Sequence, residues 1–421
     1  MQQATGQSGL DRVVIAGAGQ AGFQTALSLR DEGFKGHIDL IGDEPGLPYQ
    51  RPPLSKAYLT GKIGHASLDL RPKEILDKLA INLVPDCRIA RIDRTAHAVL
   101  TEAGVSYAYD HLVIATGTRN RPLPIPGHTL DGVCQLRTAA DADLLRPRLS
   151  TLKHIVIIGA GFIGLEVAAV ASSLGANVTV LEAAHRPMAR ALSEPMSAFF
   201  RAAHEKQGIH LAFGTTAVRI DGDEGRVRAV ETADGKMFPA DVLLIGIGVI
   251  PNTELAAEAG LAISNGIVVD EMLLTADPAI SAIGDCASYP QIFANGEMMR
   301  IESVQNAADH GRCVAARLMG KAKPYRAVPW FWSDQGPLKL QMAGLSMPHD
   351  HAVLRGEPAA SAFSVFCFRN GKLTGVESVN KPADHMIARR LIGAGTPLTP
   401  AEAADIAFDL KARAAAAPVE A

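Results

Sequence analysis

The sequence contains the same local pattern twice: an apolar run, the glycine motif G-x-G-x-x-G, a helical stretch and a second apolar run. The first copy has its apolar runs at 13–16 and 38–41, and the second has them at 155–158 and 177–181. Each copy predicts a buried β-strand, a tight turn, an α-helix and a parallel strand. With 39 glycines in 421 residues, roughly 0.3 such motifs arise by chance. The chain is therefore predicted to be α/β with two Rossmann-like dinucleotide-binding domains.

The motif glycines explain why such a turn binds a dinucleotide. They permit the tight turn, let the backbone approach a pyrophosphate and allow close packing of helix and strand, while the helix N-terminus faces the anion. We therefore predict cofactor contacts in both turns. The predicted contacts are Gly17, Gly19 and Gly22 in the first turn, and Gly159, Gly161, Ile163 and Gly164 in the second.

An acidic residue follows the second apolar run of each copy. Glu182 lies 21 residues after Gly161, and Asp43 lies 24 residues after Gly19. A carboxylate at this place accepts hydrogen bonds from ribose hydroxyls and repels a 2′-phosphate. The second domain is therefore predicted to prefer NADH over NADPH, although two arginines downstream, at 186 and 190, could weaken that preference.

Three further apolar runs end in residues suited to strand ends near a cofactor. The run at 112–115 is followed by Thr116, and the run at 243–247 by Gly248, as expected where the chain leaves each domain. The run at 280–283 ends in Gly-Asp, which places Asp285 at the carboxyl end of a parallel strand. A carboxylate there, beside a helix N-terminus, suits a ribityl hydroxyl.

Composition excludes several classes of function. The 41 basic and 44 acidic residues give a net charge of −3, which argues against nucleic acid or an anionic membrane as the main partner. The five cysteines form no C-x-x-C pair, and His349-Asp350-His351 has no further ligands at a suitable spacing, so no metal site is predicted. The N-terminal residues MQQATGQSGLDR lack the features of a signal peptide, which predicts a cytoplasmic location.

Together these segments resemble the flavoprotein reductases that have two dinucleotide-binding domains. The resemblance spans about residues 11–410. It implies an FAD-binding domain at 1–116 and 249–326, with an NADH-binding domain inserted at 117–248. An α+β C-terminal domain follows at 327–421.

Longer motifs narrow the resemblance. The strings R-P-P-L-S-K at 51–56, I-E-S-V-Q-N-A at 301–307 and W-F-W-S-D-Q at 330–335 resemble the NADH-dependent ferredoxin reductases of bacterial oxygenase systems. No cysteine precedes position 87, so the segment that carries thiols in disulfide reductases has none here. The resemblance thus implies that electrons pass from NADH through FAD, singly, to a 2Fe–2S ferredoxin. That ferredoxin would serve a haem-thiolate monooxygenase or a ring-hydroxylating dioxygenase, through a transient and electrostatically steered contact.

The resemblance also implies roles for individual residues. Lys56 is expected near the flavin N5, Glu166 is expected to pair with it and contact the nicotinamide, and Trp332 is expected to line the pocket. Without the resemblance, these could be a loop lysine, a first-turn helix carboxylate and a core aromatic. The further implied FAD contacts are Ala21, Ile89, Thr116, Arg137, Asp285 and Val304.

Two alternatives remain open. Apoptosis-inducing-factor-like flavoproteins share the R-P-P-L-S-K segment and both nucleotide folds but act as NADH-sensing interaction proteins. They typically carry a long C-terminal insertion and a targeting segment, and neither is seen in this sequence. Rubredoxin reductases are a nearer alternative because they differ only in the electron acceptor.

Overall fold

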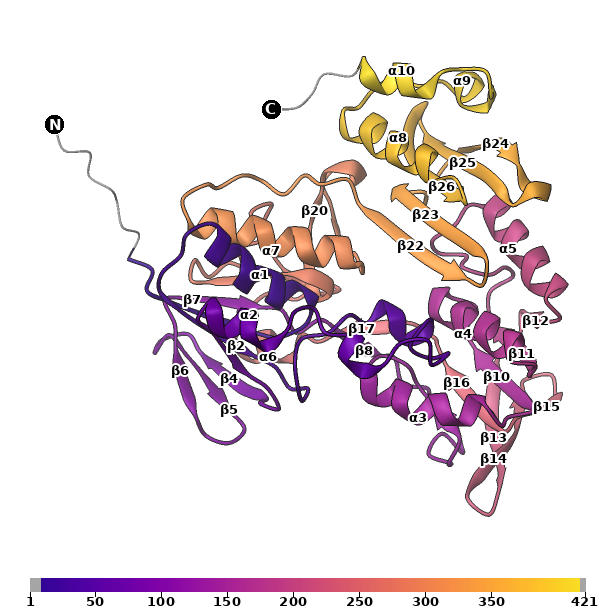
Figure 1. Cartoon of the computed structure of the whole chain (residues 1–421), viewed down its shortest axis with the longest axis horizontal. Coiled ribbons are helices and arrows are strands. Elements are labelled where there is room, and N and C mark those ends of the chain that lie inside the picture. Colours follow the sequence, from indigo (N-terminus) through magenta and orange to yellow (C-terminus); the bar gives the residue numbers. More distant parts are fainter. Residues whose placement is uncertain (1–8, 417–421) are drawn as a thin grey trace. The chain divides into compact units, whose positions relative to one another are not determined.

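The computed structural model describes residues 9–416, and the chain divides into two compact units (Figure 1). Among the described residues, unit 1 combines 9–50, 68–119 and 250–329, whereas unit 2 combines 51–67, 120–249 and 330–416. The chain passes between the units within β8 (Thr118–Asn120) and β17 (Val249–Pro251), among other places. Within the described residues, no helix combines the length and apolarity needed to cross a membrane.

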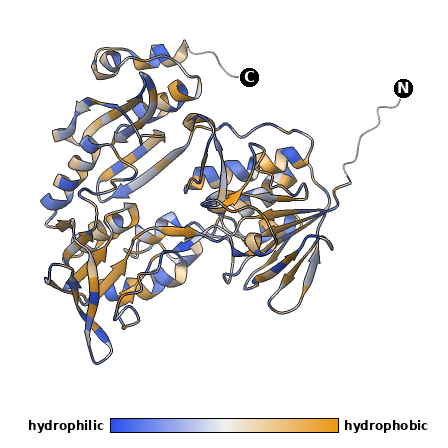
Figure 2. Ribbon diagram, turned by 180° about the vertical axis from the view of Figure 1, so that it is seen from behind, coloured by the Kyte–Doolittle hydropathy of each residue, from blue (hydrophilic) through white to orange (hydrophobic). Residues whose placement is uncertain are grey.

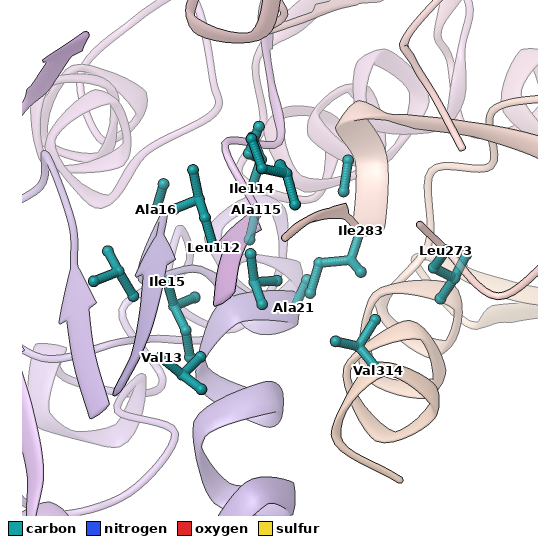
Figure 3. Packing of buried hydrophobic residues seen from close by; sticks show 14 of the residues in the cluster. Val13, Ile15, Ala16, Ala21, Leu112, Ile114, Ala115, Leu273, Ile283 and Val314 are labelled. Carbon is teal, nitrogen blue, oxygen red and sulfur yellow. The ribbon is translucent and has the colours of Figure 1, made fainter. Parts of the chain in front are cut away.

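Unit 1 is built on a five-stranded parallel sheet with the order β19-β7-β1-β2-β3. Its strands are β1 (Arg12–Ala16), β2 (His37–Ile41), β3 (Ile81–Val84), β7 (His111–Ile114) and β19 (Ile280–Ala282). Val13, Ile15 and Leu112 are fully buried, as expected for a parallel sheet covered on both faces (Figure 3). The β-branched runs seen in the sequence are therefore the central strands of this core.

Helices α1 (Gln20–Asp31) and α7 (Val304–Leu318) pack against each other in unit 1 (Figure 1). They meet closely because Gly311 has no side chain: a Cβ there would lie 2.9 Å from the backbone nitrogen of Thr25. The remaining helices of the unit are α2 (Lys73–Lys78), α6 (Glu254–Glu258), η3 (Gly284–Cys286) and η4 (Ile292–Ala294). Two small sheets complete it: β4 (Ile89–Asp93), β5 (Ala98–Thr101) and β6 (Ser106–Ala108), and β18 (Ile267–Val268), β20 (Ala287–Gln291) and β21 (Glu297–Met299).

Unit 2 contains a second five-stranded parallel sheet, with the order β12-β11-β10-β16-β9. Its strands are β9 (Val133–Cys134), β10 (His154–Ile158), β11 (Asn177–Glu182), β12 (His210–Phe213) and β16 (Val242–Ile245). Its helices are α3 (Ala139–Leu149), α4 (Phe162–Ser173), α5 (Glu194–Lys206), η1 (Pro52–Ser55) and η2 (His65–Ser67). A small antiparallel sheet is formed by β13 (Ala217–Asp223), β14 (Arg226–Thr232) and β15 (Met237–Pro239).

The C-terminal part of unit 2 is an antiparallel sheet with the order β22-β23-β26-β25-β24. Its strands are β22 (Trp330–Gln335), β23 (Leu338–Gly344), β24 (His351–Glu357), β25 (Ala362–Arg369) and β26 (Lys372–Val379). The helical segments are η5 (Pro358–Ala360), α8 (Pro382–Gly393), α9 (Pro400–Ala404) and α10 (Leu410–Ala415). Phe331 of β22 packs on Phe162 of α4, with 4.6 Å between ring centroids. The C-terminal sheet thus shares unit 2 with the second glycine motif.

The predicted fold class is confirmed. Both glycine motifs lie between a parallel strand and a helix, and the C-terminal segment is α+β. Figure 2 shows hydrophobic residues along the strands, while the helices alternate hydrophobic and hydrophilic residues, as expected for helices that cover a sheet on one side only.

Candidate functional site

The glycine turn of unit 1 is shaped to approach a ligand through its backbone. Gly17 has a φ of +118°, and a Cβ there would lie 2.3 Å from the carbonyl oxygen of Ala115. A Cβ at Gly22 would lie 1.9 Å from the Gly17 oxygen, so neither position accepts a side chain. A Cβ at Gly19, by contrast, would meet nothing within 4 Å. Open space therefore adjoins the turn on the side of Gly19.

The N-terminus of α1 has no side chain that caps it. Gly19 is the N-cap and offers no oxygen, and the first turn contains no acidic residue. The first amides of a helix lack partners within the helix and carry a partial positive charge. An uncapped N-terminus beside an open glycine turn fits the pyrophosphate of a dinucleotide.

The other residues predicted to contact FAD in unit 1 come to the same end of its sheet. Asp285 lies in η3, directly after Gly284, where a Cβ would lie 2.9 Å from the Cβ of Ala21. Thr116 follows β7 and donates its hydroxyl to the Asn252 carbonyl at 2.7 Å. Val304 is the first residue of α7, the helix that packs on α1. Thr116 and Asp285 therefore follow two strands of the sheet that also leads into the glycine turn, and Val304 begins the helix that packs on α1.

Asp43 lies after β2, exposed, in a pocket of about 390 Å³. The pocket is lined by Asp43, Asp86, Cys87, Arg88, Thr101, Glu102 and Ala103. Ile89 begins β4, one residue beyond this lining. The lining contains acidic side chains and backbone groups that can hydrogen-bond, which suits the hydroxyls of a nucleoside.

The glycine turn of unit 2 repeats this geometry. A Cβ at Gly159 would lie 2.4 Å from the Gly246 oxygen, and one at Gly164 would lie 2.2 Å from the Gly159 oxygen. A Cβ at Gly161 would meet nothing within 4 Å, and α4 has no capping side chain. Ile163 is 43% exposed in the first turn of α4. The second turn therefore also fits a pyrophosphate.

Glu182 ends β11 and holds its carboxylate beside this turn. It accepts hydrogen bonds from the Ala160 amide at 2.7 Å and from the Ala184 amide at 2.8 Å. Gly248 follows β16, which pairs with β10, the strand that leads into the glycine turn; it has a φ of +94°, and a Cβ there would lie 3.3 Å from Arg190. The predicted ribose partner is thus fixed next to the glycine turn.

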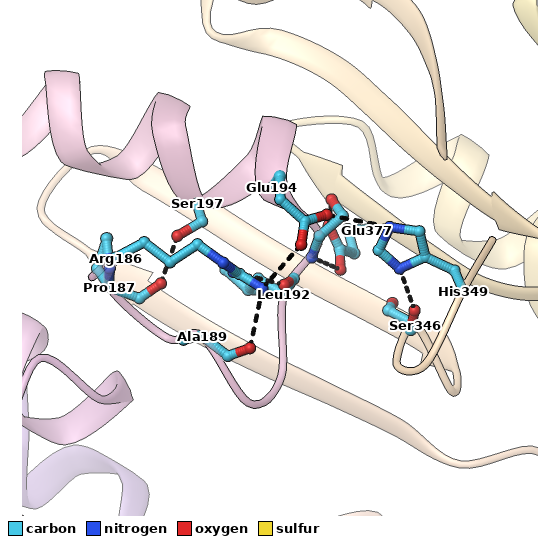
Figure 4. A network of polar contacts seen from close by, with 10 residues as sticks. Arg186, Pro187, Ala189, Leu192, Glu194, Ser197, Ser346, His349 and Glu377 are labelled. Carbon is cyan, nitrogen blue, oxygen red and sulfur yellow. Dashed lines mark hydrogen bonds and ion pairs between the residues drawn. The ribbon is translucent and has the colours of Figure 1, made fainter. Parts of the chain in front are cut away.

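The loop after β11 is held by a polar network that no sequence motif predicts (Figure 4). Arg186 donates to the carbonyls of Leu192 at 2.8 Å and Ala189 at 3.0 Å, and pairs with Glu194 at 3.3 Å. Its guanidinium is therefore bound within the loop, whereas Arg190 is exposed. Of the two arginines considered for a 2′-phosphate, Arg190 alone keeps an exposed side chain.

Glu377 ties this loop to the C-terminal sheet. The backbone amide of Ser193 donates to one Glu377 oxygen at 2.8 Å, and the Ser193 hydroxyl donates to the other at 2.6 Å. Glu377 is fully buried, and this burial raises the pKa of its carboxyl group. The same loop returns to the glycine turn, because the Met188 amide donates to the Ala160 carbonyl at 2.9 Å.

Lys56 and Glu166 form an ion pair inside unit 2. Lys56 follows η1, which packs on α4, and its Nζ lies 2.7 Å from Oε2 of Glu166. The Glu166 side chain is 2% exposed and that of Lys56 is 19% exposed. The first turn of α4 contains no acidic residue, so Glu166 is not a first-turn carboxylate of that helix. The structure brings these two predicted residues together across 110 positions of sequence.

Two serines complete the surroundings of Glu166. Ser55 donates to Oε2 at 2.5 Å and Ser333 donates to Oε1 at 2.6 Å. Sequence reasoning missed both as site residues, although each lies inside a motif that carried the family resemblance. Their proximity to Lys56 and Trp332 in the chain was the available signal.

Trp332 and Arg137 also lie in unit 2. Trp332 is the residue before Ser333 on β22, and its ring centroid lies 5.6 Å from that of Trp330. The Arg137 carbonyl accepts a hydrogen bond from Arg51 at 2.8 Å, which places it beside the R-P-P-L-S-K segment. The residues predicted to contact FAD thus come from both units.

No group of three or more histidine, cysteine, aspartate or glutamate residues within 9–416 could hold a metal ion. The five cysteines are free, and burial raises the pKa of each thiol, that of Cys313 to about 11. A raised pKa keeps a thiol protonated and unreactive. These cysteines are therefore unsuited to dithiol or peroxide chemistry.

Comparisons with known proteins agree with this arrangement. Residues 11–311 match the pyridine nucleotide-disulphide oxidoreductase family, and residues 330–414 match the reductase C-terminal family. The chain is 53% identical to rhodocoxin reductase of Rhodococcus erythropolis over 399 residues, which cover 95% of this chain and 93% of that protein.

Two solved structures are similar along almost the whole chain. The ferredoxin reductase for the CYP199A2 system from Rhodopseudomonas palustris has a TM-score of 0.94 and 50% identity, covering 96% of this chain and 100% of that one. The covalent putidaredoxin reductase–putidaredoxin complex also gives a TM-score of 0.94, with 40% identity over 97% of this chain and 99% of that one.

Proposed function

Because the chain belongs to the pyridine nucleotide-disulphide oxidoreductase family, we propose that it is an FAD-dependent NADH:ferredoxin oxidoreductase. It takes a hydride from NADH and passes electrons singly to a 2Fe–2S ferredoxin, which serves a haem-thiolate monooxygenase or a ring-hydroxylating dioxygenase. The similar proteins support the acceptor, since one is named rhodocoxin reductase and another is a reductase in covalent complex with putidaredoxin.

The observation that carries the proposal is the pair of open, uncapped glycine turns, one in each unit. Two such turns provide places for two dinucleotides. None of the five thiols is activated, so electrons have no cysteine relay to use. Bound FAD supplies the conversion from two-electron to one-electron transfer that a 2Fe–2S acceptor requires.

The residues divide between the two cofactors. In unit 1, the amides of the first turn would hold the FAD pyrophosphate and Asp285 would accept from its ribityl chain. The full set for FAD is Gly17, Gly19, Ala21, Gly22, Asp43, Lys56, Ile89, Thr116, Arg137, Asp285 and Val304. The set for NADH is Gly159, Gly161, Ile163, Gly164, Glu182 and Gly248.

Lys56, Glu166 and Trp332 carry the catalytic role. Lys56 presents a cation near the flavin, where a positive charge favours the reduced, anionic form. Glu166 holds that ammonium at 2.7 Å and would orient the nicotinamide amide. Trp332 would line the pocket beside them.

We retain the domain division and location as part of the proposal. The FAD-binding domain comprises 1–116 and 249–326, the NADH-binding domain 117–248 and the C-terminal domain 327–421. The first two domains are defined by the cofactor that each is proposed to bind, whereas the compact units are defined by their internal contacts. The enzyme acts in the cytoplasm.

The test is cytochrome c reduction by the purified protein with NADH, with and without a 2Fe–2S ferredoxin. We expect a yellow protein that NADH bleaches and that reduces cytochrome c rapidly only when ferredoxin is present. Rubredoxin serves as the matched acceptor: stimulation by rubredoxin alone would indicate a rubredoxin reductase. Bleaching without stimulation by either acceptor would favour the NADH-sensing alternative, and no bleaching would contradict the NADH assignment.

A further inference from the structure

We propose that Ser333, Gln335 and His204 form a one-way hydrogen-bond chain that positions the Glu166 carboxylate, and through it the Lys56 ammonium. All five residues belong to unit 2. The inference rests on the proposed function, which places Glu166 and Lys56 at the reacting ends of the two cofactors. It adds three positioning residues to that site.

The chain is continuous from α5 to α4. His204 Nε2 lies 2.6 Å from Gln335 Oε1, and Gln335 Nε2 lies 3.3 Å from Ser333 Oγ. Ser333 Oγ then donates to Glu166 Oε1 at 2.6 Å. His204, Ser333 and Gln335 are each fully buried, so water does not compete for these bonds.

Alternation along β22 explains how one strand supplies two members. Successive side chains of a strand point to opposite faces, so Phe331, Ser333 and Gln335 share one face. Phe331 packs on Phe162 of α4, and Ser333 meets Glu166 of the same helix. The two tryptophans, Trp330 and Trp332, lie together on the other face, with 5.6 Å between ring centroids.

The chemistry of the groups fixes the direction of the chain. A carboxylate only accepts, so the single proton of the Ser333 hydroxyl is used by Glu166. Ser333 can then only accept from Gln335, which orients the amide nitrogen toward Ser333 and the amide oxygen toward His204. His204 must therefore carry its proton on Nε2.

His204 is suited to be the origin of such a chain. Burial lowers the pKa of His204, so the imidazole is neutral and has one proton to donate. Its Nδ1 has no hydrogen-bond partner among residues 9–416. The residue lies near the end of α5, whose beginning is held by Glu377 through Ser193.

A chain in which every donor points toward one carboxylate has a defined effect. Aligned hydrogen bonds polarise one another and stabilise negative charge at the acceptor end. Ser333 occupies Oε1 of Glu166 and leaves Oε2 to Lys56 and Ser55. The carboxylate therefore cannot rotate without losing both sets of bonds, which keeps the ammonium of Lys56 in a fixed position.

The test compares S333A, S333T and S364A in the flavin-loaded protein by stopped-flow reduction with NADH. S333A should lower the rate constant of flavin reduction at saturating NADH about tenfold or more, the effect of losing one hydrogen bond to a charged group. The dissociation constant of NADH should change less than about threefold, because Ser333 acts on orientation. S333T keeps the hydroxyl and should restore most of the rate.

S364A is the matched control. Ser364 is equally buried in the same sheet, and it hydrogen-bonds to Ser378 and Asp384, which do not belong to the proposed hydrogen-bond chain. Its rate constant should stay within about twofold of the wild type. An unchanged rate in S333A, or an equal loss in S364A, would overturn the proposal.

A second readout is independent of activity. In protein labelled with ¹³C at the glutamate carboxyl, the Glu166 resonance, assigned by its loss in E166Q, should move in S333A and return in S333T. In ¹⁵N-histidine spectra, His204 should be protonated on Nε2. A Glu166 resonance that does not move in S333A, or a proton on Nδ1 of His204, would refute the proposed hydrogen-bond chain. If NADH fails to reduce the flavin of the wild-type protein, the proposed function is contradicted. The spectra would still show whether the hydrogen-bond chain exists.

Discussion

Replacing Glu377 by alanine should destabilise unit 2 by about 3 kcal/mol. The Ser193 amide and hydroxyl would both lose their acceptor, and Ser193 is fully buried, so water does not replace it. Each buried group left without a partner costs about 1–3 kcal/mol. Part of this cost is offset because the variant no longer buries a carboxyl group, whose desolvation raises the pKa of Glu377 in the folded protein.

Tryptophan fluorescence reports this change selectively, because the two tryptophans of the chain, Trp330 and Trp332, both lie in unit 2. A loss of about 3 kcal/mol lowers the melting temperature of a unit of this size by about 6–12 °C. S193A removes the hydroxyl but keeps the hydrogen bond from the backbone amide to Glu377. Its free energy of unfolding should therefore fall by about half as much. K372A, which truncates an exposed lysine of the same strand as Glu377, should change stability by less than about 0.5 kcal/mol.

The same contact predicts a pH dependence. Burial raises the pKa of Glu377 in the folded state, so the folded protein holds this proton more tightly than the unfolded chain does. The stability that this group contributes is therefore present at acid pH. It is lost as the pH rises from the pKa of Glu377 in the unfolded chain toward its higher pKa in the folded protein. E377Q should gain stability relative to the wild type over that rise. An E377A variant that melts within 2 °C of the wild type, roughly the effect of 1 kcal/mol or less, would refute the reasoning.

Three further predictions concern the cofactor sites and unit 1. Replacing Asp285 by alanine should yield largely colourless protein on purification, because the ribityl contact is lost; full retention of the yellow colour would count against that contact. Replacing Glu182 by alanine should lower the ratio of catalytic efficiencies for NADH and NADPH by about tenfold, the effect of one hydrogen bond to a charged group; an unchanged ratio would rule out its role at the ribose. His310 is fully buried and its pKa is lowered to about 3, so the unfolded chain binds a proton that the folded one does not, and unit 1 should lose stability as the pH falls from about 6.5 toward 3. H310N, whose amide oxygen can still accept from the Gly284 amide, should shift acid unfolding and flavin release to lower pH, and an unchanged midpoint would exclude His310 as the cause.

The features that could be predicted from the sequence are those that depend on the local pattern of apolar residues or on glycine. The two strand–turn–helix units follow from apolar runs and from turns where a Cβ would collide with backbone, as at Gly22 and Gly164. The approach of Lys56 to Glu166 followed from the family resemblance, since no periodicity links residues so far apart. The distance of 2.7 Å between Lys56 Nζ and Glu166 Oε2 agrees with that expectation.

The polar contacts between distant segments could not be predicted in this way. Glu377, Ser193 and His204 are buried groups whose partners come from other elements, and their types alone suggest an exposed glutamate, a helix cap and a surface histidine. Ser193 is the N-cap of α5 but donates its hydroxyl to Glu377 instead of capping the helix. Such pairings depend on how the C-terminal sheet packs against α5, which the order of residues does not reveal.

Each unit is assembled from three separate stretches of chain, and this has a consequence for biosynthesis. Helix α1 leaves the ribosome early, but its packing partner α7 ends only at Leu318. The Glu166 carboxylate that pairs with Lys56 gains its partner Ser333 later still, because β22 follows α7 in the chain. A nascent chain therefore exposes the apolar surfaces of α1 and its sheet until α7 is made, and exposed apolar surface of this kind favours aggregation. A message truncated before codon 330 would yield neither the Glu166 environment nor a complete second unit.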